Sequence, residues 1–138
     1  MSRFGCALAL VAGCAGNPTV EAPALDAAFF AARVQPILAA RCATPVCHGS
    51  ERRRLRVYAP GLFRRDPRRL HRDEALTDDE VRANALSAEA FAAGASAEES
   101  LLVTKPLDRV PHLGGRVFTL PDDDWDTLVA WLRTGEAQ

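Results

Sequence analysis

Two cysteines and a histidine stand within seven residues of one another, at Cys42, Cys47 and His48, directly after a segment whose apolar residues recur at helical spacing. The chain has 138 residues, of which 48% are apolar and 25% charged, and this allows one globular domain with a single core. One small domain must therefore support any chemistry of this cluster. With 17 basic and 18 acidic residues, the chain has no excess of positive charge that would argue for nucleic acid as a partner.

The N-terminus has the pattern of an export signal. Arg3 precedes an apolar run over residues 6–12, which is shorter than the about 20 residues that cross a bilayer. The run ends in Leu10-Val11-Ala12-Gly13 before Cys14, and this resembles a bacterial lipoprotein signal. The resemblance implies that residues 1–13 are a signal peptide and that Cys14 becomes the lipidated first residue. An ordinary secretory signal cut nearby is the alternative.

A lipid on Cys14 would tether the exported protein to a membrane surface, facing the periplasm or the cell surface. Residues 14–25 contain Pro18 and Pro23 and little that could be buried, so they are predicted to form a flexible tether. The predicted globular domain comprises residues 26–138.

The remaining cysteines, Cys42 and Cys47, need a joint explanation in an oxidising compartment. A disulfide between them is one alternative. A zinc site is disfavoured, because the adjacent Cys47 and His48 cannot easily occupy two corners of one tetrahedron and no second histidine follows at zinc-ligand spacing. A redox-active dithiol usually has a two-residue spacer at a helix N-terminus, whereas these cysteines follow a predicted helix.

The pattern of apolar residues and caps predicts an all-α domain, because no alternating run is long enough for a sheet. A first helix starts at Asp26, and Pro36 predicts a bend near Gln35. Its apolar positions are Phe30, Val34, Ile37 and Leu38. Two capping boxes, at Thr77 to Glu80 and at Ser96 to Glu99, predict two short helices.

A last helix is predicted to begin at three consecutive aspartates, residues 122–124, because negative charge is stabilising at the positive, N-terminal end of a helix dipole. Gly135 is expected to stop it. Its predicted apolar stripe comprises Trp125, Leu128, Val129 and Leu132.

Two thiols and a following histidine also fit covalent haem attachment. In c-type attachment the thiols add across the two haem vinyl groups and the histidine after the second cysteine binds iron. The cluster resembles that of class I cytochromes c, although the spacer here is four residues and the common one is two. The segments that resemble a bacterial subgroup of that family are Val34-Gln35-Pro36-Ile37-Leu38, Arg41, Cys47-His48-Gly49, Ser100-Leu101-Leu102, Lys105-Pro106-Leu107, Pro111-His112-Leu113-Gly114-Gly115, Phe118 and Trp131-Leu132.

The resemblance implies a class I cytochrome c-like fold in which the N- and C-terminal helices pack around one covalently attached haem c. Cys42 and Cys47 would carry the haem and His48 would bind its iron. The segment from Ser50 to Phe91 matches the subgroup poorly.

The second axial ligand must be a histidine if it comes from this chain, because Met1 is the only methionine. The candidates are His71 and His112. His112 is favoured because it precedes the last helix, where the family's distal ligand normally lies, and because Gly114 and Gly115 would let the backbone approach the ring closely. The alternative for His112 is a surface-loop histidine with a local hydrogen bond.

With both axial positions filled, the expected protein is a bis-histidine electron carrier that works with redox protein partners and is not an enzyme. One alternative is a haem-free helical lipoprotein stapled by a Cys42–Cys47 disulfide, acting as a binding or structural module. Another is a haem enzyme or gas sensor with five-coordinate iron, if His112 does not reach the metal. The basic stretch from Arg52 to Arg72 is expected to be a solvated loop, with acidic redox partners or haem propionates as alternative contacts.

Overall fold

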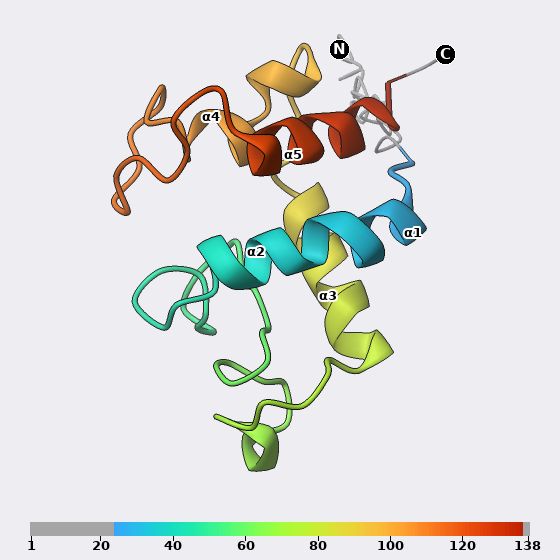
Figure 1. Cartoon of the computed structure of the whole chain (residues 1–138), viewed down its shortest axis with the longest axis vertical. Helices are drawn as coiled ribbons and strands as arrows, with labels where there is room; N and C mark the ends of the chain where they lie inside the picture. The colour runs from blue at the N-terminus through green and yellow to red at the C-terminus, as the bar shows by residue number, and fades with distance from the viewer. Residues whose placement is uncertain (1–23, 137–138) are drawn as a thin grey trace, which may run out of the picture.

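The computed structural model describes residues 24–136, which form a small all-α domain with no strand in that range (Figure 1). The predicted fold class, all-α, is confirmed at this level. The signal peptide, Cys14 and nearly all of the predicted tether lie outside the described residues. The helical elements are α1 (Ala27–Phe29), a π segment (Phe30–Val34), α2 (Gln35–Arg41), a 3-10 turn (Pro67–Arg69), α3 (Asp78–Glu89), a second 3-10 turn (Ala97–Glu99), α4 (Leu101–Thr104) and α5 (Asp123–Arg133).

The first helix runs without interruption from α1 through the π segment into α2. The Asp26 carboxylate caps it by accepting hydrogen bonds from the backbone N–H groups of Ala28 and Phe29. The irregularity expected near Gln35 takes the form of a π turn, in which the Gln35 N–H donates to the carbonyl of Phe30. This turn stands directly before Pro36, whose missing N–H interrupts the regular hydrogen-bond ladder.

Of the two predicted capping boxes, the one at α3 is confirmed and the other is wrong. The Thr77 hydroxyl accepts from the Glu80 N–H, and the Glu80 carboxylate accepts from the Thr77 N–H. Ser96 makes no such side-chain bond and only a 3-10 turn follows it. The buried Ser100 starts α4 instead, because its hydroxyl donates to the Phe91 carbonyl and accepts from the Leu102 N–H.

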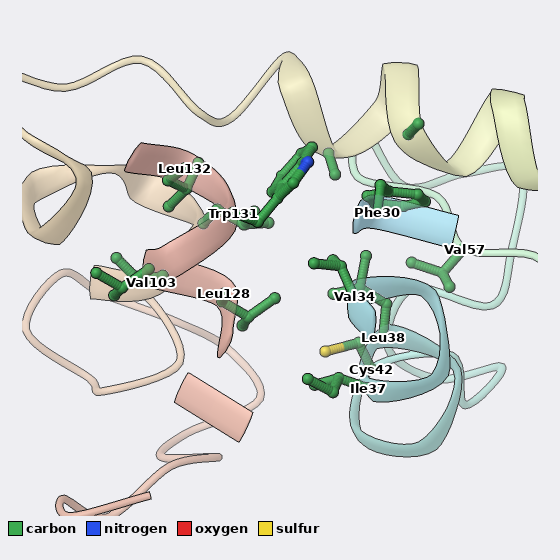
Figure 2. Close-up of a cluster of buried hydrophobic side chains, with 14 of the residues drawn as sticks. Phe30, Val34, Ile37, Leu38, Cys42, Val57, Val103, Leu128, Trp131 and Leu132 are labelled. Carbon is green, nitrogen blue, oxygen red and sulfur yellow. The ribbon is translucent and has the colours of Figure 1, made fainter. Parts of the chain in front are cut away.

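The first helix and α5 pack against each other, as expected (Figure 2). The rings of Phe30 and Trp131 lie 5.1 Å apart, and the Trp131 indole N–H donates to the Asp26 carbonyl over 3.0 Å. Trp131 is fully buried although the predicted apolar stripe did not include it, whereas Trp125 is only partly buried. Leu128 points toward the first helix near Val34 in Figure 2.

The segment 51–76 is fastened to α3 by buried polar groups. Arg64 and Glu80 form a buried ion pair at 2.8 Å, and Arg64 also donates to the backbone carbonyls of Glu74 and Ala75. The Asn84 amide accepts from the Tyr58 N–H and donates to the Tyr58 carbonyl. These contacts hold an irregular segment in place without a strand or a long helix. In residues 24–136, no helix has the length and apolar character needed to cross a bilayer.

Candidate functional site

A cavity of about 540 Å³ opens where α2 ends, between the loop that follows α2 and the loop between α4 and α5. Figure 1 shows these loops gathered at one end of the domain, at the left of the view. The volume falls in the range usual for small-molecule and cofactor sites. Apolar side chains from separate segments form much of the wall: Leu38, Leu55, Phe91, Leu102, Val117, Phe118 and Leu128.

The Cys42 to Gly49 loop brings both thiols and His48 to this cavity. The Cys42 N–H closes the last turn of α2, and its carbonyl accepts from the His48 N–H over 3.0 Å. The four-residue spacer is folded back, because the N–H groups of Cys47 and Gly49 both donate to the Thr44 carbonyl. Both thiols are free, Cys42 being buried and Cys47 partly so.

Gly49 has a role that was not assigned from the sequence. A Cβ on this residue would lie 2.0 Å from the carbonyl oxygen of Ala43, so the folded loop has no room for a side chain there. Its place directly after His48 was the available signal, although spacing alone does not reveal such a close backbone contact.

His48 presents its Nε2 as a free electron-pair donor. Its Nδ1 lies 2.9 Å from the Leu55 carbonyl, which can only accept, so Nδ1 carries the proton and donates. Burial lowers the pKa of His48, the Leu55 hydrogen bond opposes this effect, and electrostatic repulsion from His112 and Arg53 lowers the pKa further. A neutral imidazole with Nδ1 fixed in this way is the form that binds metals.

His112 is held in the same way from the opposite loop. Its Nδ1 donates to the Gly115 carbonyl over 2.8 Å, and the Gly115 N–H returns a bond to the His112 carbonyl. Gly115 has φ +67°, which favours glycine, and a Cβ on Gly114 would lie 3.1 Å from the His112 ring. Both glycines therefore fit the turn that carries the ring.

The two imidazole rings lie close together and nearly parallel. Their centres lie 6.1 Å apart with only 9° between the ring planes, and both rings line the cavity. A metal bound end-on by two imidazoles, each at about 2.0–2.1 Å, would place the nitrogens about 4 Å and the ring centres about 6 Å apart. His71 is exposed in the segment 51–76 and does not line this cavity.

The Cys42 thiol lacks the low pKa of a reactive redox dithiol. Burial raises the pKa of Cys42 to about 11, with the Arg41 charge opposing and Cys47 adding to the rise. This thiol stays protonated near neutral pH, unlike the reactive thiolate of a redox dithiol. Across residues 24–136 no three or more His, Cys, Asp or Glu side chains are grouped so that they could hold a metal ion.

The charges around the cavity are of one sign. Four cationic side chains line it and no carboxylate does: Arg41, Arg53, Arg54 and Lys105. An apolar wall with a cationic edge suits a ligand with an apolar body and anionic groups, and haem has this chemistry.

Searches of family models, of curated proteins and of solved structures each found no match to this chain.

Proposed function

We propose that this chain is a monohaem c-type cytochrome with a class I cytochrome c-like fold, acting as an electron carrier. The observation that carries the proposal is the pair His48 and His112. Each ring has its Nδ1 bonded to a backbone carbonyl, and the two ring centres lie 6.1 Å apart beside two free thiols.

Cys42 and Cys47 would hold the haem c covalently. Each S–H would add across one vinyl group, with one new S–C bond and the hydrogen on the other vinyl carbon, so the addition would need neither oxidant nor reductant. The position of both thiols on the cavity wall with His48 supports this assignment.

His48 and His112 would be the axial ligands. The bound haem supplies a one-electron ferric/ferrous couple. The Leu55 and Gly115 carbonyls fix the two rings and make their nitrogens stronger donors, while the apolar wall limits access of water. With both histidines bound to the iron, no open position would remain for a substrate, so the site would favour electron transfer over catalysis, and the two histidines would give a lower potential than His/Met ligation.

The proposed setting is a membrane-tethered lipoprotein, lipidated at Cys14 and facing the periplasm or cell surface, that exchanges electrons with redox proteins. This part rests on the N-terminal sequence alone.

The test is the intact mass of protein made together with cytochrome c maturation machinery. We expect the polypeptide mass plus one haem, retained under denaturing conditions, and loss of the added mass in a C42S/C47S double variant. A mass lower by two hydrogens would instead establish the disulfide-stapled lipoprotein and contradict the proposal.

A further inference from the structure

The arginines of the segment 51–72 differ in whether they form ion pairs. Nine arginines lie between residues 51 and 72. Four of them, none of which lines the cavity, pair with acids: Arg64 with Glu80, Arg68 with Asp66, and Arg69 and Arg72 with Glu74. The other five are in no ion pair among the described residues: Arg52, Arg53, Arg54, Arg56 and Arg65.

Two of the unpaired arginines line the cavity, together with Arg41 and Lys105. Arg41 already binds Asp122 and Asp124, at 3.5 and 3.0 Å. Arg53 donates to the Val46 carbonyl over 2.8 Å and so steadies the spacer of the cysteine loop. Arg54 is exposed, and no hydrogen bond or ion pair within residues 24–136 uses its guanidinium group.

Lys105 is the corresponding cation on the other loop. Its ammonium group donates to the Pro111 carbonyl over 3.1 Å, next to His112, and has two further N–H donors. No carboxylate within 4.0 Å balances its charge among the described residues. Arg54 and Lys105 thus bring cations without acidic partners to one cavity from two separate segments.

We propose that Arg54 and Lys105 bind the two propionate carboxylates of the haem, an inference that rests on the proposed function. The guanidinium fork of Arg54 can bind a carboxylate through two parallel N–H bonds, and the ammonium of Lys105 can bind the other as a point charge. Such bonds would orient the macrocycle within the cavity while Cys42, Cys47 and the two histidines hold it.

The experiment compares R54Q, K105Q and the control R52Q, each as holoprotein. Arg52 is a neighbouring exposed arginine that does not line the cavity. The readouts are the propionate bending bands in resonance Raman spectra and the reduction potential. K105R keeps the positive charge, so it distinguishes loss of that charge from a general disturbance of the Pro111 loop.

We expect R54Q and K105Q each to shift a propionate band and to lower the equilibrium constant for reduction roughly threefold to tenfold, because a positive charge near the iron is lost. R52Q should leave the propionate bands unchanged, and K105R should keep the wild-type potential. Propionate bands in R54Q and K105Q that match those of wild type would overturn the inference. A spectrum of covalently bound haem in the same samples would leave the proposed function unaffected.

Unchanged bands together with a slower, salt-dependent reaction of R54Q with an acidic redox protein would assign Arg54 to partner docking and overturn its propionate role. A wild-type protein without covalent haem would overturn the proposed function, and the inference with it.

Discussion

At the scale of single residues, the site depends on two histidines held alike in different loops. His48 follows the second cysteine and His112 lies on a glycine turn. The Nδ1–H of each ring donates a hydrogen bond to a backbone carbonyl. The sequence predicted both candidates because chemistry-bearing residues are few. It did not predict the carbonyl partners or the need for Gly49, since both depend on how the backbone folds back on itself.

Replacing His112 with alanine is expected to change the iron's spin state. Loss of the sixth ligand should convert a low-spin, six-coordinate absorption spectrum into a high-spin or water-ligated one, while the haem stays covalently attached. His71→Ala is the matched control, because His71 is exposed and outside the cavity, and it should leave the spectrum unchanged. A low-spin bis-imidazole spectrum that persists in the His112 variant and disappears in the His71 variant would transfer the assignment to His71.

At the scale of elements, helix starts that depend on hydrogen bonds within one turn were predicted correctly. Features that depend on tertiary contacts were not. The Thr77 cap and the aspartate-rich start of α5 are local, and both were predicted. Ser96 has the same local pattern, yet burial of Ser100 moves the helix start. Trp131 was missed as a core residue because its burial depends on Phe30 and on the Asp26 carbonyl, 105 residues away along the chain.

Trp131→Ala is expected to destabilise the domain strongly. The side chain is fully buried between α5 and the first helix, so its removal should cost about 3–5 kcal/mol of unfolding free energy. Leu86→Ala, at an α3 position that is 61% exposed, should change stability much less. Urea denaturation of the two holoproteins gives the comparison, and equal midpoints would contradict the packing of the terminal helices described above.

Glu80→Gln tests how the segment 51–76 is held. Burial raises the pKa of Glu80, but bonds from Arg64 and from the Thr77 and Arg65 N–H groups outweigh it and lower the pKa to about 2. Breaking this buried pair should cost about 3–5 kcal/mol near neutral pH. The control Glu98→Gln, which loses an exposed pair with Arg133, should change stability much less.

The pH dependence of this effect has a definite sign. A carboxyl whose folded pKa lies below its ordinary 4.5 stabilises the fold above that pH and loses the contribution as pH falls toward about 2. The stability difference between wild type and Glu80→Gln, followed by chemical denaturation from pH 6 to pH 2, should therefore shrink on acidification. A difference that is constant over this range would contradict the ion-pair account.

At the scale of the whole molecule, the first helix separates the start of the described chain from the cavity. At about 1.5 Å per residue, residues 27–41 extend about 22 Å. The chain enters at the α1 end and the Cys42 loop leaves at the α2 end, on the opposite side of Figure 1. A tether attached before α1 would thus leave the cavity remote from its attachment point. The sequence alone did not predict this arrangement, nor the course of the segment 51–76, whose anchors are buried polar pairs.

Cys14→Ser should release the protein from the membrane fraction, because the lipid on Cys14 is the proposed attachment. The haem spectrum of the released protein should match that of wild type, since the described chain begins at the α1 end of the first helix, remote from the cavity. Cell fractionation followed by absorption spectroscopy of the soluble and membrane fractions measures both the release and the haem spectrum. Unchanged membrane association would contradict the proposed lipid tether.

The proposed electron carrier depends on the ligation of one haem iron by two histidines of this chain. Magnetic circular dichroism of the ferric wild-type holoprotein, extended into the near infrared, tests it most directly because the low-spin charge-transfer band reports the pair of axial ligands. We expect a single low-spin species with bis-imidazole ligation. A high-spin spectrum, or a low-spin band typical of any other ligand pair, would contradict it.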